Sequence, residues 1–201
     1  MSSRYYHNDD YFNRIDNEEK SYWLGYIAAD GNVHNFKGHL RFTLTVASKD
    51  LDHLMKFKSH INAENPFQKY KSGARSLVLC SDKLCNSLID KGITERKTFV
   101  LKPPNKVPDD LIRHWIRGYF DGDGCINLRK DGINRRIHIS GTKEVCEFIN
   151  SNIPFYCSIK KNKGIYCIRV NQQKAVRWTY NYFYLDSNVF MERKYEKFNY
   201  N

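Results

Sequence analysis

The sequence predicts an α+β fold built from two similar units in tandem, and three observations support it: a duplicated motif, a duplicated order of elements and a proline-rich joint. The motif is "WLGYIAADG" at 23–31 and "IRGYFDGDG" at 116–124. Each copy contains a glycine, two bulky apolar residues and a final Asp-Gly that follows a small residue. Internal repetition of this kind determines the architecture of a chain.

A strand and then a helix are expected after each copy of the motif. Apolar and polar residues alternate at 39–46 and at 136–140, which is the period of a strand with one buried face. Ser48 and Thr142 then precede apolar residues at helical spacing, and both are suited to cap a helix N-terminus. The shared order indicates that more than the motif is duplicated.

A hairpin and a further helix complete each unit. Hairpin turns are expected at 72–73 and at 162–164, and helical sequence begins near Ser81 and near Asn171. The chain is therefore predicted to contain two pseudo-symmetric helix–strand–strand–helix–strand–strand–helix (αββαββα) repeats. Two such units normally pack about a pseudo-two-fold axis.

The joint between the repeats contains Pro103, Pro104 and Pro108, which exclude a regular helix there. An acidic and aromatic segment precedes the first repeat, and we expect it to pack on that repeat rather than on a ligand. The predicted segments are an N-terminal extension at 1–20, a first repeat at 21–102, a linker at 103–109 and a second repeat at 110–201.

The charge of the chain indicates a polyanionic partner. Its net charge is +11 and its pI is about 9.3, values that are typical of nucleic-acid-binding proteins. The first 20 residues carry three Lys or Arg against five Asp or Glu, so the basic surplus belongs to the two repeats.

The composition disfavours a membrane or secreted protein. No apolar run approaches the length of a membrane span, and the N-terminal residues lack the apolar centre of a signal peptide. Six cysteines form no Cys-x-x-Cys pair, which disfavours a zinc site and favours reduced thiols. We expect a cytoplasmic location in a bacterium or a phage-infected host, or an organellar matrix.

The small residues of the motif predict a close contact between two helices. On a helix, Gly25 and Ala29 lie one turn apart on one face, as do Gly118 and Gly122. A glycine inside a helix costs about 1 kcal/mol relative to alanine, so a compensating contact is expected. We predict that the two motif helices pack on each other through these four residues.

Each motif helix is predicted to end at an aspartate. Asp30 and Asp123 would lie at the negative end of a helix dipole, unfavourable by roughly 0.3–1 kcal/mol, while Gly31 and Gly124 suit the left-handed position after a helix. Close packing would bring the carboxylates together, which becomes favourable if they hold Mg²⁺ or a similar cation. The alternative is that the small residues serve only a helix interface and the aspartates cap loops.

The two copies resemble the LAGLIDADG motif of homing endonucleases, in the single-chain form that carries the motif twice. The resemblance extends from about Tyr22 to Lys197. Ala28 replaces the inner aspartate of the motif in the first copy, whereas Asp121 retains it in the second. The resemblance implies a saddle of two antiparallel sheets in the DNA major groove, with the motif helices at its centre.

The resemblance also implies roles for four residues. The last acids of the motifs, Asp30 and Asp123, would bind Mg²⁺ (or Mn²⁺) at the two scissile phosphates. Lys97 and Lys194, each closing a Glu-Arg-Lys sequence, match the basic residue that the family places near each metal. The alternative for both lysines is ordinary solvated surface charge.

Polar side chains on the predicted strands and beside the hairpin turns suit contacts with phosphates and base edges. Each one alone is equally explained as solvated charge, so the prediction is for the whole face. The residues predicted to contact DNA are His39, Arg41, Thr43, Thr45, Lys69, Lys71, Arg75, Arg136, His138, Ser140, Lys160, Lys161 and Lys163.

These observations predict a monomeric, site-specific endonuclease that hydrolyses double-stranded DNA with a divalent metal held by the motif aspartates, as in intron homing by a mobile genetic element. The alternative is a nucleic-acid-binding protein of the same fold without cleavage activity, either an RNA maturase acting on intron RNA or a DNA-binding regulator. A third hypothesis is an endonuclease domain derived from an intein.

Overall fold

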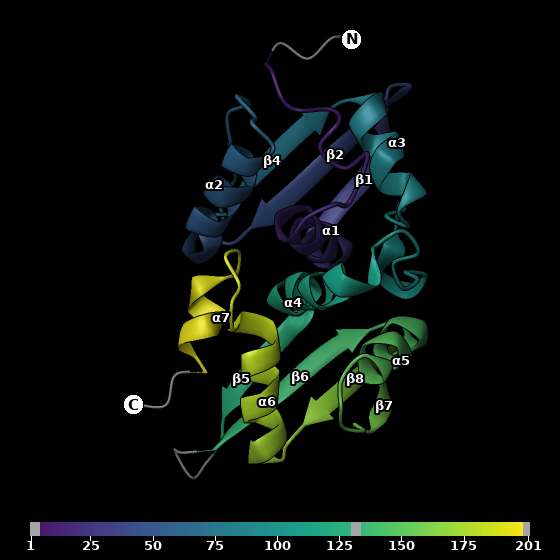
Figure 1. Ribbon diagram of the computed structural model, residues 1–201. Helices are drawn as coiled ribbons and strands as arrows, with labels where there is room; N and C mark the ends of the chain where they lie inside the picture. The colour runs from purple at the N-terminus through teal and green to yellow at the C-terminus, as the bar shows by residue number, and fades with distance from the viewer. Residues whose placement is uncertain (1–4, 130–133, 199–201) are drawn as a thin grey trace.

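The computed structural model describes residues 5–129 and 134–198, which form two units joined through a central pair of helices (Figure 1). The elements of the first unit are α1 (Glu18–Asp30), β1 (Gly31–Phe36), β2 (His39–Val46), the 3₁₀ helix η1 (Ser48–Asp50), α2 (Leu51–His60), β3 (Gln68–Lys69), β4 (Arg75–Cys80), α3 (Asp82–Asp90) and the 3₁₀ helix η2 (Lys97–Phe99).

The second unit repeats this order. Its elements are the 3₁₀ helix η3 (Asp109–Leu111), α4 (Ile112–Asp123), β5 (Gly124–Leu128), β6 (Arg135–Gly141), α5 (Lys143–Ser151), β7 (Ile159–Asn162), β8 (Ile165–Val170), α6 (Gln173–Tyr184) and α7 (Glu192–Glu196).

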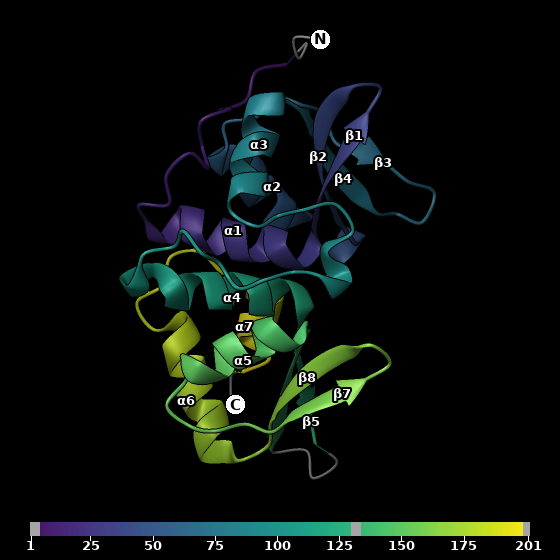
Figure 2. The same ribbon diagram turned by 90° about the vertical axis from the view of Figure 1, so that its right-hand side faces the viewer.

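Each unit contains one four-stranded antiparallel sheet, in the order β1-β2-β4-β3 in the first and β5-β6-β8-β7 in the second. The register also corresponds, because the glycine that ends each motif pairs with the following strand: Gly31 with Leu44 and Gly124 with Ile139. The predicted α+β fold with two αββαββα repeats is confirmed. The helices cover one side of the sheets, and the strands lie on the other side (Figure 2).

The alternating strands bury one face, as the sequence predicts. Phe42 and Leu44 of β2, and Ile137 and Ile139 of β6, are buried beneath the helices. Since neighbouring residues on a strand point to opposite faces, the polar residues between them point away from this core. Each sheet therefore presents a polar face on the side without helices.

Each motif helix is anchored by aromatic packing within its own unit. Trp23 of α1 lies 5.0 Å, ring centre to ring centre, from Phe57 of α2. Phe120 of α4 lies 5.0 Å from Phe183 of α6. The two helices at the centre of the molecule are thus rigidly attached to the sheets that they separate.

A fully buried arginine connects the two units. Arg117 of α4 donates to a Glu18 carboxylate oxygen at 2.7 Å, to the Val189 carbonyl at 2.9 Å and to the Phe183 carbonyl at 3.0 Å. Glu18 belongs to the first turn of α1, so this charge pair joins the start of one motif helix to the middle of the other.

The helix after β2 does not begin as expected. Thr142 caps α5 by accepting from the Val145 N–H at 3.2 Å, as predicted, but Ser48 does not cap α2. It opens η1, and the Asp50 N–H is satisfied by the Ala47 carbonyl at 2.9 Å. The backbone turn takes over the bonding that a side-chain cap would provide.

The N-terminal segment packs on the first unit, as expected. Tyr11, Phe12 and Ile15 are buried, and the Asn8 N–H donates to the Ile61 carbonyl at 3.0 Å. All six cysteines are free thiols. Within residues 5–129 and 134–198, no helix combines the length and the apolar character needed to cross a membrane.

Candidate active site and nucleic-acid interface

The motif helices α1 and α4 touch backbone to backbone. A Cβ atom built on Gly25 would overlap the carbonyl oxygen of Trp115, and one built on Gly118 would overlap the carbonyl oxygen of Tyr22. No side chain larger than hydrogen fits at either position. The close contact that the sequence predicts at these glycines is confirmed.

The contact continues to the ends of both helices. A Cβ atom on Gly122 would overlap the methyl group of Ala29, and it would lie 3.5 Å from a carboxylate oxygen of Asp30. The Asp30 side chain therefore passes beside the residue that precedes Asp123. The two aspartates meet at the centre of the molecule, on adjacent helix ends.

The glycines after the aspartates have a role other than the predicted one. Gly31 has φ −75° and Gly124 has φ −87°, so both are extended and neither is left-handed. A Cβ on Gly31 would lie 2.6 Å from the side chain of Ile27, and one on Gly124 would overlap Phe120. Each glycine allows the chain to turn directly from helix into strand against the last helical turn.

The aspartates reach solvent but are crowded by the surrounding protein. Burial raises the pKa of Asp30, and burial together with the nearby Asp30 charge raises the pKa of Asp123 to about 6. Hydrogen bonds from Tyr26 to Asp30 and from Tyr119 to Asp123 oppose these shifts only in part. Burial is thus the main cause of both raised pKa values, because the positive charges of Lys194 and Lys97 also oppose the shifts.

Lys97 lies at the end of α1. Its Nζ donates to the carbonyl of Ala29 at 3.1 Å and to the carbonyl of Gly31. The residue is 9% exposed, and burial lowers the pKa of its ammonium group, although the charges of Asp123 and Asp30 oppose this. The alternative of a solvated surface lysine does not describe this residue.

Lys194 of α7 occupies the corresponding place at the end of α4. Its Nζ donates to the carbonyls of Phe120 at 2.8 Å, Gly122 at 3.1 Å and Gly124 at 2.6 Å. It is 5% exposed, and burial lowers its pKa to about 8. Both lysines therefore satisfy the free carbonyls and the negative dipole at a motif helix end.

A cavity of about 130 Å³ opens beside Asp123. It contains residues of both units, because Lys97 and Thr98 come from the first and Tyr119 and Ser140 from the second. Ala28, which replaces the inner aspartate in the first motif, also lines it. Lys97 and Asp123 consequently face the same space, although they belong to different repeats.

The corresponding position near the end of α4 is filled. The Asp121 carboxylate is buried and accepts from the hydroxyl of Tyr22 at 2.7 Å, the hydroxyl of Tyr184 at 3.1 Å and the N–H of Met191 at 2.8 Å. Met191 directly precedes α7. Asp121 thereby fixes the helix that carries Lys194.

An ion pair across the two units supports the same helix. Arg193 of α7 donates to both carboxylate oxygens of Asp50, at 2.7 and 3.1 Å. Sequence reasoning did not find this pair, the role of Asp121 or the cavity residues Thr98 and Tyr119. The sequence contained a signal for Tyr119, because a tyrosine follows the first glycine in both motif copies.

The donor types of the site fit a divalent cation. Asp30 and Asp123 supply hard oxygen ligands, and their raised pKa values mark a place where added positive charge is favourable. In the described part of the chain, no group of three or more His, Cys, Asp or Glu side chains could hold a metal by itself. Oxygens of a bound phosphate and water would have to complete the coordination.

The residues predicted to contact DNA lie where the sequence places them, on the polar strand faces and around the hairpin turns. Some of them also make local contacts: the Arg75 guanidinium donates to the Gly73 carbonyl at 2.7 Å, the hydroxyls of Thr45 and Ser76 lie 2.5 Å apart, and Ser140 lines the cavity beside Asp123. The exposed members are His39, Thr45, Lys69, Lys71, Arg136, Lys160, Lys161 and Lys163, and the half-buried members are Arg41, Thr43, Arg75, His138 and Ser140.

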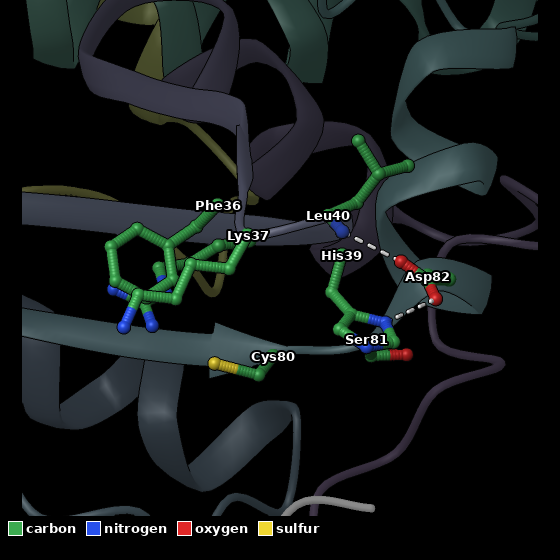
Figure 3. Close-up of a pocket in the computed structure, with 8 residues that line it drawn as sticks. Phe36, Lys37, His39, Leu40, Cys80, Ser81 and Asp82 are labelled. Carbon is green, nitrogen blue, oxygen red and sulfur yellow. Dashed lines mark hydrogen bonds and ion pairs between the residues drawn. The ribbon is translucent and has the colours of Figure 1, made fainter. Parts of the chain in front are cut away.

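A second cavity, of about 230 Å³, lies beside the β1–β2 hairpin (Figure 3). Asp82 accepts from the Leu40 N–H at 2.6 Å and contacts the His39 ring at 3.3 Å. The Arg41 guanidinium lies 3.8 Å above the centre of the Phe36 ring. Two side chains of the polar strand face are thus held in fixed orientations.

This geometry defines a class of protein: a tandem-repeat α+β chain with paired acids at the centre of a polar, basic surface. No protein-family model matches the sequence, and no curated protein sequence matches it.

Solved structures match over most of the chain. A double lysine-to-alanine variant of I-SmaMI is 14% identical, covering 90% of this chain and 88% of its own, with a TM-score of 0.64. The LAGLIDADG meganuclease I-AabMI bound to uncleaved DNA is 11% identical over 91% and 88%, with a TM-score of 0.63. The I-LtrWI LAGLIDADG homing endonuclease bound to target DNA is 17% identical over 95% and 89%, with a TM-score of 0.63. The chain therefore has the fold of the LAGLIDADG homing endonucleases.

Proposed function

We propose that this protein is a site-specific, Mg²⁺-dependent endonuclease that cuts both strands of DNA. The observation that carries the proposal is the meeting of Asp30 and Asp123 at two touching helix ends, each beside a buried lysine. Such an arrangement is poor for stability, since like charges lie close together at negative dipole ends. It is well suited to a reaction in which two phosphates and their metal ions are bound.

The chain's own residues divide the work of hydrolysis. Bound Mg²⁺ would supply a Lewis acid and an activated water. Asp30 and Asp123 would hold the cations, one for each strand. Lys97 and Lys194 carry positive charge next to the scissile phosphates, where negative charge develops in the transition state. The cavity beside Asp123 is large enough for ordered water.

The rest of the molecule supports binding to duplex DNA. The two polar sheet faces lie on one side of the molecule (Figure 2), and the basic hairpins border them. The net charge of +11 suits an interface dominated by phosphates, so binding should weaken steeply as salt rises. The two repeats supply the pseudo-two-fold symmetry that a dimer would otherwise provide, and we propose a monomer acting on a long, roughly palindromic site.

Cleavage-site selection from a randomised duplex library with Mg²⁺ tests the activity and identifies the target. Asp30→Asn and Asp123→Asn should each retain binding and lose double-strand cleavage, by about 100-fold or more. Asp90→Asn, an acid on α3 outside the site, serves as the matched control. Normal linearisation of a target plasmid by both site variants would show that the aspartates do not form the metal site.

The second candidate is a nucleic-acid-binding protein without cleavage activity, acting as a maturase on intron RNA or as a DNA-binding regulator. One observation favours this candidate: both lysines donate hydrogen bonds to carbonyls at the helix ends. A protein of this fold without cleavage activity would need the same stabilising bonds. Tight binding of a selected duplex, or of structured intron RNA, without cleavage at any Mg²⁺ concentration would favour this candidate.

A further inference from the structure

An exposed apolar pair lies next to the proposed active site. Phe99 is 67% exposed and Val100 is 61% exposed, and together they follow Lys97 in the η2 segment. A phenylalanine exposed to this extent leaves most of its apolar surface in water in the free protein. Phe99 is two residues from Lys97 of the site, so a molecule bound at the site could cover its ring.

The segment that carries the pair is held rigidly. The N–H groups of Val100 and Leu101 donate to the Lys97 carbonyl at 3.0 and 2.8 Å. The Leu101 carbonyl accepts from the Thr142 hydroxyl at 2.7 Å, which ties the segment to the second unit. Because Lys97 itself is bonded to the end of α1, the apolar pair has a fixed position relative to both aspartates.

Basic residues lie beside the pair. A Cβ atom on Gly164, in the turn of the β7–β8 hairpin, would lie 3.5 Å from the Phe99 ring. The same hairpin carries Lys160, Lys161 and Lys163, all of which are exposed. An apolar protein surface would leave the charges of these neighbouring lysines without partners. A polyanion that presents apolar surface between its charges does, and stacked base pairs between phosphates have this character.

The arrangement of the sheets specifies which groove reaches the pair. Two sheets that occupy successive stretches of the major groove on one side of a duplex leave the minor groove facing the protein between them. The η2 segment lies between the two sheets at the ends of α1 and α4, on the side of the strands (Figure 2). Apolar side chains that enter a minor groove insert between base pairs and kink the duplex.

We propose that Phe99, supported by Val100, is a wedge that inserts from the minor groove between base pairs near the centre of the target. This inference rests on the proposed binding of duplex DNA, but it does not require that the DNA be cut. Insertion unstacks one step and kinks the duplex toward its major groove, which opens the minor groove that faces the paired carboxylates.

Within the described residues, an exposed apolar pair follows the site lysine in the first unit only. In the second unit, the residues at the same offsets after Lys194 are Glu196 and Lys197, which are exposed and charged. The kink therefore lies to one side of the pseudo-two-fold axis. It should also favour a flexible pyrimidine–purine step at that position, because such steps unstack most easily.

The test uses the full chain and a duplex recovered by selection for binding, with Ca²⁺ replacing Mg²⁺ so that the DNA stays intact. The fluorescence of 2-aminopurine, placed in turn at each central position, reports unstacking. Wild-type protein should raise the signal at one off-centre step. Phe99→Ala should abolish the increase, reduce the bend measured with circularly permuted duplexes, and weaken binding about tenfold.

Two controls separate the possible outcomes. Leu185→Ala removes a side chain that is 59% exposed and directly follows α6, a helix on the side away from the strands (Figure 2), and should leave all three measurements unchanged. An unchanged 2-aminopurine signal in Phe99→Ala, with a normal melting temperature, would overturn the wedge while leaving the endonuclease proposal intact. A wedge signal without Mg²⁺-dependent cleavage would support the wedge and count against the endonuclease. Phe99-dependent dimerisation in sedimentation, with no change in base stacking, would also overturn the wedge.

Discussion

The ends of α1 and α4 carry the same charged groups on different supports. Beside Asp123, the small Ala28 lines an open cavity that Lys97 also faces. At the end of α4, the residue corresponding to Ala28 is Asp121, which is buried and bonded to three donors. The duplicated acids and lysines are therefore equivalent in chemistry but not in surroundings.

This difference should separate the two strands in the proposed reaction. The cavity beside Asp123 has room for water, and Lys97 there is bonded to two carbonyls only. Lys194 is held more firmly, by three carbonyls and by the contacts of Asp121 and the Arg193–Asp50 pair with its helix. We expect one strand to be cut before the other, so that nicked DNA accumulates as an intermediate.

The largest effect is expected where the helices touch through backbone alone. Gly118→Ala places a methyl group against the Tyr22 carbonyl oxygen, and Gly25→Ala places one against that of Trp115. Neither backbone can move without separating the two units, so we expect a loss of more than about 4 kcal/mol in the free energy of unfolding. Urea unfolding measures it, and a stable, fully active Gly118→Ala variant would contradict the helix contact.

At the ends of the helices the two motif copies differ by one methyl group, because Ala29 corresponds to Gly122. Substitution can move this methyl group from one helix to the other. Gly122→Ala overlaps the side chain of Ala29, so we expect about 1–3 kcal/mol of destabilisation. The double variant Ala29→Gly/Gly122→Ala moves the methyl group to the other helix and should recover most of the loss. A double-mutant cycle in urea measures the coupling; simple additivity would show that these residues do not contact each other.

The next effect concerns the inner position of the motif. Asp121→Ala leaves the Tyr184 hydroxyl and the Met191 N–H without an acceptor and leaves the Tyr22 hydroxyl only His53 Nε2, at 2.9 Å, so we expect a cost of about 3–5 kcal/mol. Ala28→Gly, the matched change in the other copy, should cost only about 1 kcal/mol. Thermal and urea unfolding of both variants tests the asymmetry, and equal losses would remove it.

Much of this architecture follows from the sequence because the two copies confirm each other. The duplicated motif, the alternation in β2 and β6 and the small residues of the helix contact are local patterns with direct physical meaning. The burial of Arg117 and Asp121 could not be predicted, because their partners lie far along the chain, as Glu18 does from Arg117. The extended conformation of Gly31 could not be predicted either, because a glycine after a helix is usually left-handed.

The lysines provide a test of the strand assignment. Because Lys97 and Asp123 face one cavity, Lys97→Met and Asp123→Asn should slow cleavage of the same strand, each by about 100-fold. Lys194→Met and Asp30→Asn should each slow cleavage of the other strand. A duplex labelled with a different fluorophore on each strand resolves the two nicks. If each lysine variant instead slows the same strand as the aspartate of its own repeat, the cavity does not define the pairing.

The smallest expected effect is a pH-dependent gain in stability. Asp123 has a pKa of about 6 in the folded protein and an ordinary value near 3.8 when unfolded. Its ionisation therefore opposes folding, and this cost is absent below pH 3.8, grows between the two values and is complete above pH 6. Asp123→Asn should raise the melting temperature at pH 7.5 by about 2–4 °C, and the gain should vanish near pH 4.

Metal connects this effect to the proposed function. At pH 7.5, Mg²⁺ should raise the melting temperature of the wild type, because a bound cation favours the ionised carboxylates of the folded state. Asp123→Asn should respond less to Mg²⁺, since its charge conflict is already removed. Asp30→Asn offers the sharper comparison: by removing the charge beside Asp123, it should lower the Asp123 pKa, which NMR titration of the carboxylate measures. An unchanged Asp123 pKa in that variant would mean that the two motif ends do not interact electrostatically.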